Sequence, residues 1–283
     1  MTINVWLMGG LCNQIFMIFA TVSYAIDNMI NFNLISHNDK TMNDTKTYWN
    51  TLLDGFKENV YADTTEMYTF YEPSHTYNKI PDVLSQTKFK LMGYFQSHKY
   101  FQHNYDKIIA MMNLRDKQKE IKTKYSSFLD KKTIAMHFRI GDYYGLQYYH
   151  CIKSPQYYIA ALKTLEKSLK DNNENIEDYN ILYFCQKGDI PVIQDYLNII
   201  RENSNTQYNF VSINHDITDW EQLLLMSVCN HFIIANSTFS WFGAYFCENT
   251  NKIVCYPSVW FGPGYADKKT YDMFPAEWKM VVG

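Results

Sequence analysis

Residues 133–142 read TIAMHFRIGD, a run in which apolar and polar side chains alternate with period two. The alternation predicts a strand that turns its apolar residues into a core and presents His137 and Arg139 together on the other face. A guanidinium at the end of a strand suits a diphosphate, because its planar N–H donors match phosphate oxygens. Asp142 would either hold this arginine in place or end the strand as a turn residue. A buried structural ion pair is the alternative interpretation of the same residues.

Downstream of this stretch, strands and helices alternate regularly. Helices are expected over 155–169 and 191–200, with Ser154 as the N-cap of the first, and a capping box Thr218-x-x-Glu221 begins a third. The expected strands are ILYFCQ, FVSIN, HFIIAN and KIVCYP. Such alternation predicts a parallel sheet covered by helices, and ligands of such sheets bind beyond the carboxyl ends of the strands.

Upstream, the chain opens with a similar pattern. INVWLM reads as a strand, Gly9 and Gly10 as a tight turn, and the following apolar residues recur at helical spacing. Residues 30–36 alternate as a second strand would, and a further strand is expected at 89–95, leading into a helix. The polar, aromatic segment 38–86 indicates no particular fold. The pattern in the first half of the chain therefore predicts a second α/β unit with its own sheet.

A densely charged segment separates the two halves. Residues 116–132 carry six lysines among few apolar side chains, which is typical of a solvated helix followed by a linker. We place the domain boundary there, with an N-terminal α/β domain over 1–125 and a C-terminal α/β domain over 126–283.

The glycine turn is the first of two further polar motifs. In Gly9-Gly10-Leu11-Cys12-Asn13-Gln14, the glycines allow close approach of a ligand, and the helix N–H groups and the amides of Asn13 and Gln14 would point into the same space. The motif lacks the G-x-G-x-x-G spacing, and no acidic residue ends the next strand to hold a ribose. A plain structural turn and a nicotinamide enzyme remain the alternatives.

The second motif, Asn236-Ser237-Thr238-Phe239-Ser240-Trp241, follows a strand and begins a helix. Hydroxyl groups and unpaired N–H groups in the first helical turn would form an anion site supported by the helix dipole. The alternative is an ordinary N-cap, for which Ser and Thr are preferred.

Composition excludes several classes of function. A net charge of −3 gives no basic field for nucleic acid, so any anion must be bound by a local site. No stretch reaches the roughly 20 apolar residues of a transmembrane helix, and the start lacks the basic flank of a signal peptide. Six cysteines without C-x-x-C spacing are typical of free thiols in a reducing compartment, so we expect a cytoplasmic protein. The 24 tyrosines and 18 phenylalanines reflect either coding bias or a sugar-binding surface.

Taken together, the three motifs resemble glycosyltransferase family 11, the α-1,2-fucosyltransferases. That family shows G-G-L-G-N-Q, H-x-R-R-G-D-Y and N-S-T-F-S-W-W in this order, and further matches lie between them. This chain departs from the pattern at Cys12, Ile140 and Phe242. Cys12 replaces a glycine of the family, which bears on how closely a ligand can approach the backbone there. Ile140 replaces the second arginine, but the strand pattern already directs residue 140 away from the site.

The resemblance implies a GT-B fold, two Rossmann-like domains facing across a cleft, with GDP-fucose held mainly by the C-terminal domain. The N-terminal domain would be the acceptor side, with an acceptor pocket expected mostly from residues 38–86 and from loops. Arg139 would contact the donor pyrophosphate, and His137, Ser237, Thr238 and Phe239 would line the nucleotide pocket. By the same resemblance, the glycine loop with Gly10 and Gln14 would face the donor, and Asn13 would lie close to the reacting centre.

The implied reaction is transfer of fucose from GDP-fucose to a hydroxyl of a glycan acceptor, with inversion at the anomeric carbon. No D-x-D motif is present, so we expect no metal cofactor, with Arg139 and the helix start at Ser237 supplying the electrostatic stabilisation. Asp142 and His150 are candidate bases for the acceptor hydroxyl. The alternative from another class is a nucleotide- or carbohydrate-binding protein of this fold without turnover.

Overall fold

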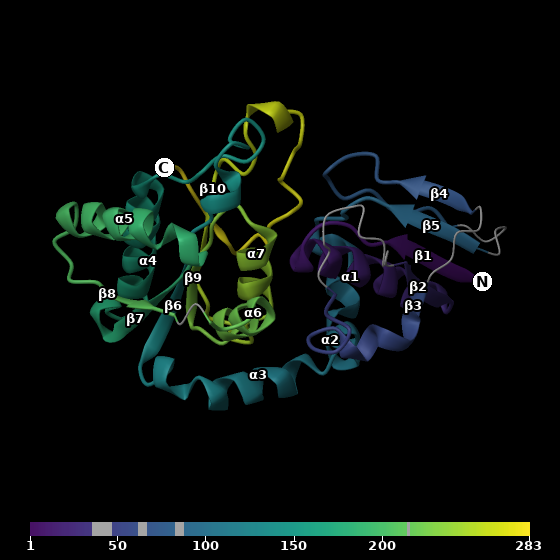
Figure 1. Cartoon of the computed structure of the whole chain (residues 1–283), viewed down its shortest axis with the longest axis horizontal. Helices are drawn as coiled ribbons and strands as arrows, with labels where there is room; N and C mark the ends of the chain where they lie inside the picture. Colours follow the sequence, from purple (N-terminus) through teal and green to yellow (C-terminus); the bar gives the residue numbers. More distant parts are fainter. Residues whose placement is uncertain (36–46, 62–66, 83–87, 214–215) are drawn as a thin grey trace. The chain divides into compact units, whose positions relative to one another are not determined.

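The computed structural model describes residues 1–35, 47–61, 67–82, 88–213 and 216–283. Within these residues the chain forms two compact α/β units (Figure 1). The first comprises residues 1–117 and a returning segment, Asp267–Pro275, and the second comprises Gln118–Ala266 and Ala276–Gly283. The units divide at Lys117, within the charged region where the boundary was expected but before residue 125. The return of 267–275 was not anticipated.

The first unit is built on a five-stranded parallel sheet in the order β3-β2-β1-β5-β4. Its described elements are β1 (Thr2–Trp6), α1 (Leu11–Asn28), β2 (Asn31–Ile35), the 3-10 helix η1 (Asp54–Asn59), β3 (Val60–Tyr61), β4 (Tyr68–Tyr71), β5 (Lys88–Met92), η2 (His98–Tyr100), η3 (Gln102–Asn104) and α2 (Tyr105–Met111). Helix α3 (Leu114–Lys124) then leads into the second unit. Part of the segment 38–86 lies outside the described residues.

Helix α1 is nearly all buried because its apolar residues face the sheet on one side and other helices on the other. It begins at Leu11, after the N-cap Gly10, and the preceding Gly9 has a φ of +71°, which is strained for any residue with a Cβ. It ends at Met29, which adopts a left-handed conformation and donates backbone hydrogen bonds to the last turn. The glycine turn therefore lies at a fixed place, between the carboxyl end of β1 and the start of a buried helix.

The second unit holds a six-stranded parallel sheet in the order β11-β10-β9-β6-β7-β8. Its described elements are η4 (Ser126–Phe128), β6 (Lys132–His137), η5 (Gly141–Tyr143), α4 (Pro155–Asp171), η6 (Ile176–Asp178), β7 (Tyr179–Phe184), η7 (Lys187–Asp189), α5 (Ile190–Glu202), β8 (Asn209–Ser212), α6 (Asp219–Ser227), β9 (His231–Ile233), α7 (Thr238–Tyr245), β10 (Val254–Pro257), η8 (Pro263–Tyr265) and β11 (Lys279–Val281). In Figure 1, α4 and α5 cover one side of this sheet, and α6 and α7 lie on the other.

The alternation along β6 is the one expected from the sequence. Ile134, Met136, Phe138 and Ile140 all belong to the buried core beneath α4 and α5, although the strand itself ends at His137. Because the period-two pattern continues past the strand, His137 and Arg139 share the opposite side. The expected capping box at Thr218 and Glu221 is also confirmed.

Both sheets reverse their strand order at one point, and the polar motifs lie at these points. In the second unit, β7 and β8 extend from β6 in one direction, whereas β9, β10 and β11 extend in the other. In the first unit, β2 and β3 lie on one side of β1, and β5 and β4 on the other. Ligands of open parallel sheets bind beyond the strand ends at such reversals. The predicted fold of two Rossmann-like parallel-sheet units, as in the GT-B class, is confirmed.

The returning segment is fixed to the first unit mainly through Asp272. Its carboxylate is paired with Lys99 and accepts a hydrogen bond from the backbone N–H of Tyr77 at 3.2 Å. Its carbonyl accepts a hydrogen bond from the Ser97 hydroxyl at 2.5 Å. Residues far apart in sequence thus complete the N-terminal unit.

None of the helices described here combines the length and apolar character that crossing a membrane requires. All six cysteines are free, and five of them are buried, as their positions in apolar runs indicated.

Candidate functional site

The candidate site in the second unit begins where β6 ends. Arg139 follows the strand by two residues, and its Nη2 donates a hydrogen bond to Asp142 Oδ2 at 2.5 Å. Its guanidinium also lies over the ring of Tyr143, 5.5 Å from the centroid. The Arg139 side chain is 29% exposed to solvent, and the Asp142 side chain is 47% exposed. The arginine is therefore held on two sides while its charge stays accessible to a ligand.

His137 lies beneath this arginine and is buried. Desolvation, with a smaller contribution from the positive charge of Arg139, lowers the pKa of His137 to about 3. The imidazole is therefore neutral at physiological pH. Its ring faces Phe239 with 5.6 Å between the centroids, so the ends of β6 and the start of α7 are in contact.

The segment that follows β9 lies on the other side of the candidate site, opposite the end of β6. Ser237 caps α7, and its hydroxyl accepts a hydrogen bond from the Phe239 N–H at 3.3 Å. The Asn236 side chain donates hydrogen bonds to the carbonyls of Cys151 and Trp260, at 3.0 and 2.9 Å. The ordinary N-cap and the anion site are thus compatible, because the cap uses an acceptor lone pair and leaves the hydroxyl proton available.

Three polar atoms at this place are buried without a hydrogen-bond partner among the described residues: His137 Nδ1, Arg139 Nε and Asn236 Oδ1. A buried polar group left unpaired costs roughly 1–3 kcal/mol, so most proteins avoid it. Three such atoms gather on adjoining strand ends, which marks this place as a candidate ligand site. Their mix of donor and acceptor character suits a polar ligand that carries both.

The glycine-turn residues lie together in the first unit. Gln14 is buried, and its amide donates to the Gly9 carbonyl at 3.0 Å, so it supports the turn. Asn13 accepts a hydrogen bond from Gln96 at 3.0 Å, which joins the segments that follow β1 and β5. Gly10 is exposed, and a Cβ there would meet no atom within 4 Å. Gly9 is closely packed, since a Cβ added there would lie 2.7 Å from the Asn13 side chain.

All six residues expected in the C-terminal site lie around the carboxyl ends of β6 and β9. They are His137, Arg139, Asp142, Ser237, Thr238 and Phe239. Gly10, Asn13 and Gln14 lie around the ends of β1 and β5 in the first unit. The candidate base His150 stacks on Tyr143, with 4.9 Å between ring centroids. Tyr143 in turn donates a hydrogen bond to the Asn236 carbonyl at 3.0 Å, and burial raises its pKa to about 12.

Several supporting residues had no role in the sequence interpretation. Lys153 is buried and donates to the Val259 carbonyl at 2.5 Å, which joins the loops around the site. Asp189 accepts from the Gly141 N–H at 3.0 Å, and Tyr158 donates to the His137 carbonyl at 3.1 Å. Asn236 is the first residue of the motif that the sequence analysis quoted, but nothing local marks Lys153 or Asp189, whose partners are distant in sequence.

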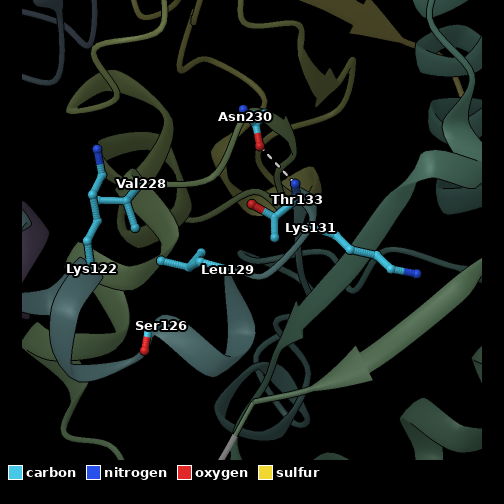
Figure 2. A pocket seen from close by; sticks show the side chains of 7 residues that line it. All are labelled: Lys122, Ser126, Leu129, Lys131, Thr133, Val228 and Asn230. Atoms are coloured by element: carbon cyan, nitrogen blue, oxygen red, sulfur yellow. Dashed lines mark hydrogen bonds between the residues drawn. The ribbon is translucent and has the colours of Figure 1, made fainter.

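A separate pocket of about 320 Å³ lies at the opposite end of β6, lined in part by Leu129, Thr133 and Asn230 (Figure 2). Asn230 accepts a hydrogen bond from the Thr133 N–H at 2.8 Å, and the Lys131 side chain extends away from the other labelled residues. Because this pocket is at the amino end of the strand, it is not part of the candidate site. Across the part of the chain that the structure describes, no cluster of three His, Cys, Asp or Glu residues is arranged to hold a metal ion.

Comparison with solved structures finds fucosyltransferase NodZ from Bradyrhizobium at a TM-score of 0.46, with 7% identity over 87% of this chain and 93% of that one. A mutant of Arabidopsis thaliana FUT1 in complex with GDP matches at a TM-score of 0.47, with 12% identity over 89% of this chain and 69% of that one. These values are below the level at which a structural likeness supports an inference about substrate.

Two curated relatives from Escherichia coli are similar in sequence. An alpha-1,2-colitosyltransferase is 25% identical over 74% of this chain and 68% of its own length. The O-antigen biosynthesis glycosyltransferase WbnK is 27% identical over 50% of this chain and 43% of its own length. The family model for glycosyl transferase family 11 matches residues 34–281, which include the Arg139 and Ser237 segments but not the glycine turn. Since this match extends over most of the chain, the protein belongs to glycosyl transferase family 11.

Proposed function

We propose that the protein is an inverting α-1,2-fucosyltransferase that moves L-fucose from GDP-fucose to a hydroxyl of a glycan, with O2 of a galactose as the acceptor atom. Membership of the family supports glycosyl transfer, and the similarity to an alpha-1,2-colitosyltransferase supports the linkage. The observation that carries the donor proposal is the group of unpaired buried atoms on His137, Arg139 and Asn236.

These atoms fit a nucleoside diphosphate because Arg139 Nε can donate to a phosphate oxygen at a strand reversal, whereas Asn236 Oδ1 can accept only from the N–H or O–H groups of a nucleoside. Arg139 would donate to the pyrophosphate oxygens, and the Ser237 hydroxyl with the first turn of α7 would donate from the neighbouring strand end. Negative charge grows on the diphosphate as the sugar departs. Donors held in place before the reaction begins would stabilise this charge.

The reaction in this proposal is a single displacement. The acceptor oxygen attacks the anomeric carbon of a β-linked fucose, the bond to the diphosphate breaks, and the product is α-linked. The acceptor proton leaves to a base. We propose His150 for this role, since it stacks on Tyr143, whose ring lies under the Arg139 guanidinium. Asp142, hydrogen-bonded to Arg139, serves to orient the guanidinium.

A donor screen tests the proposal. GDP release is measured with GDP-fucose, a GDP-activated colitose and GDP-mannose, each with and without N-acetyllactosamine. We expect GDP-fucose to give the highest acceptor-dependent rate. Analysis of the product by NMR should show an α-anomeric proton on fucose linked to galactose O2. A faster rate with colitose would reassign the donor, and GDP binding without release would favour the non-catalytic alternative.

Arg139→Ala is the matched variant for this screen. Loss of such a donor commonly costs about 3–4 kcal/mol of transition-state stabilisation, so turnover should fall by roughly two to three orders of magnitude. Arg201→Ala, an exposed arginine that lies over Phe210 on α5 and β8, is the control and should keep turnover within about twofold. Equal rates for the two variants would contradict the assignment of Arg139.

A further inference from the structure

An aromatic surface adjoins the candidate site within the second unit. It consists of Tyr143, Tyr148, Tyr149, His150 and Tyr265, which we call the aromatic platform. Successive ring centroids lie 5.1 Å apart for Tyr148 and Tyr149, 4.9 Å for Tyr149 and Tyr265, 5.7 Å for Tyr265 and His150, and 4.9 Å for His150 and Tyr143. Tyr143 lies under the Arg139 guanidinium. The rings therefore form a continuous path from the candidate donor site to the surface.

The outer end of the platform is open to solvent. Tyr148 is 63% exposed and Tyr149 is 41% exposed. Large aromatic side chains that stay exposed beside a functional site are typical of binding surfaces, because their burial by a ligand is favourable. Clustered tyrosines offer an apolar face together with hydroxyl groups at the ring edges.

Backbone contacts hold the platform in place before any ligand binds. The Gly262 N–H donates to the Tyr149 carbonyl at 2.8 Å, and the Gly264 N–H donates to the Tyr148 carbonyl at 2.7 Å. A Cβ on Gly264 would lie 2.6 Å from the Tyr148 ring, so only glycine permits this contact. Lys153 adds a third connection between the same two loops. Such preorganisation reduces the entropy lost when a ligand binds.

We propose that the aromatic platform is the binding surface for the acceptor glycan, with Tyr148 and Tyr149 packing against the C–H faces of its sugar rings. This inference rests on the proposed function for the identity of the acceptor. The outer ring planes argue for sugar: Tyr148 and Tyr149 meet at 80°, and Tyr265 meets His150 at 72°, whereas the inner pair of Tyr143 and His150 is nearly parallel at 24°. A flat purine base stacks best on one ring or between parallel rings, whereas a puckered chain of sugars presents C–H groups in several directions and fits tilted rings.

The platform is tested by direct binding, without turnover. Saturation-transfer NMR with N-acetyllactosamine should give a signal for the wild type and for Tyr148→Phe, and a signal reduced about tenfold or more for Tyr148→Ala. Tyr68→Ala, which removes an exposed tyrosine at the amino end of β4 in the first unit, should behave as the wild type. Because Tyr148 is exposed, all variants should keep their melting temperature.

The affinity for GDP, measured by calorimetry, should be equal in all four proteins. A tenfold loss of GDP affinity in Tyr148→Ala would overturn the proposal by showing that the ring stacks on the nucleotide. The proposal also fails if N-acetyllactosamine gives no signal with the wild type, or the same signal with Tyr148→Ala. Failure of the proposed function has a different signature, since wild-type protein would then bind the sugar but release no GDP from GDP-fucose.

Discussion

His137 and Phe239 lie ring to ring, 5.6 Å between centroids, and join the end of β6 to the first turn of α7. The Nδ1 atom of this histidine is buried without a partner within the described chain, and burial keeps the ring neutral by lowering its pKa to about 3. A buried polar atom without a partner lowers the stability of the folded protein. In the proposed function, a ligand would supply the missing partner.

Replacing His137 should separate binding from stability. His137→Phe keeps a ring against Phe239 and removes the unpaired nitrogen, so the melting temperature of the ligand-free protein should be equal or higher. The affinity for GDP should fall about tenfold, because one hydrogen bond to the ligand is lost. Differential scanning calorimetry and GDP titration measure the two quantities. Unchanged GDP affinity with a lower melting temperature would identify the histidine as a purely structural residue.

Asp142 is expected to position Arg139 and not to accept the proton. In Asp142→Asn the hydrogen bond at 2.5 Å loses its charge, and kcat/KM should fall about tenfold at every pH, with the shape of the pH profile retained. The conservative variant Asp142→Glu should recover part of the loss. A profile that loses its acidic limb in Asp142→Asn would instead assign the carboxylate as the general base.

Catalysis should not depend on a divalent metal, since Arg139 and the start of α7 are proposed to supply the positive charge. Incubation with EDTA followed by gel filtration should leave the rate of GDP release within about twofold of the untreated enzyme. The addition of Mg²⁺ or Mn²⁺ should not raise it further. A rate that collapses with EDTA and returns with one metal would disprove this part of the mechanism.

Folding stability should fall in mild acid because of His231. Burial lowers the pKa of this residue to about 4, and both ring nitrogens are used: Nδ1 accepts from the Ile253 N–H at 3.0 Å, and Nε2 lies 3.2 Å from the Tyr179 hydroxyl. Below pH 6.5 the unfolded histidine binds a proton that the folded one excludes. The free energy of unfolding therefore decreases as pH falls from about 6.5 to 4, by about 1.4 kcal/mol per pH unit for such a group.

The matched variant for this effect is His231→Gln, which carries no titratable group. Its free energy of unfolding should be lower than that of the wild type at pH 7.5, and it should lose less on acidification to pH 5. Urea denaturation at the two pH values measures both. Equal losses in the two proteins would show that the histidine is protonated in the folded state.

The second unit could be predicted closely from its sequence because each element carries its own local signal. Ser154 with Pro155, the Thr218 capping box and Ser237 mark helix starts that the structure confirms. The placement of His137 and Arg139 on one face followed from period-two alternation alone. Since strand ends of a parallel sheet meet at one edge, these motifs were expected to converge, and their segments do so around β6 and β9.

The first unit was harder to predict because its decisive contacts are not local. Strand β4, Tyr68–Tyr71, is four residues long and is defined by its pairing with β5. The strand expected at 89–95 ends at Met92, because Phe95 takes a left-handed conformation and Glu72 accepts the N–H groups of Tyr94 and Phe95. In the second unit, the aromatic platform also depends on non-local contacts, because Gly262 and Gly264 donate hydrogen bonds to a loop more than a hundred residues earlier in the sequence.

The return of Asp267–Pro275 to the first unit has a consequence for biosynthesis. Domains usually fold in order as the ribosome releases them. Here the N-terminal unit lacks the carboxylate that pairs with Lys99 until residue 272 has been translated, by which time nearly all of the second unit has been synthesised. A nascent chain arrested before that point would carry an incomplete first unit, so the two halves reach their final form late and almost together.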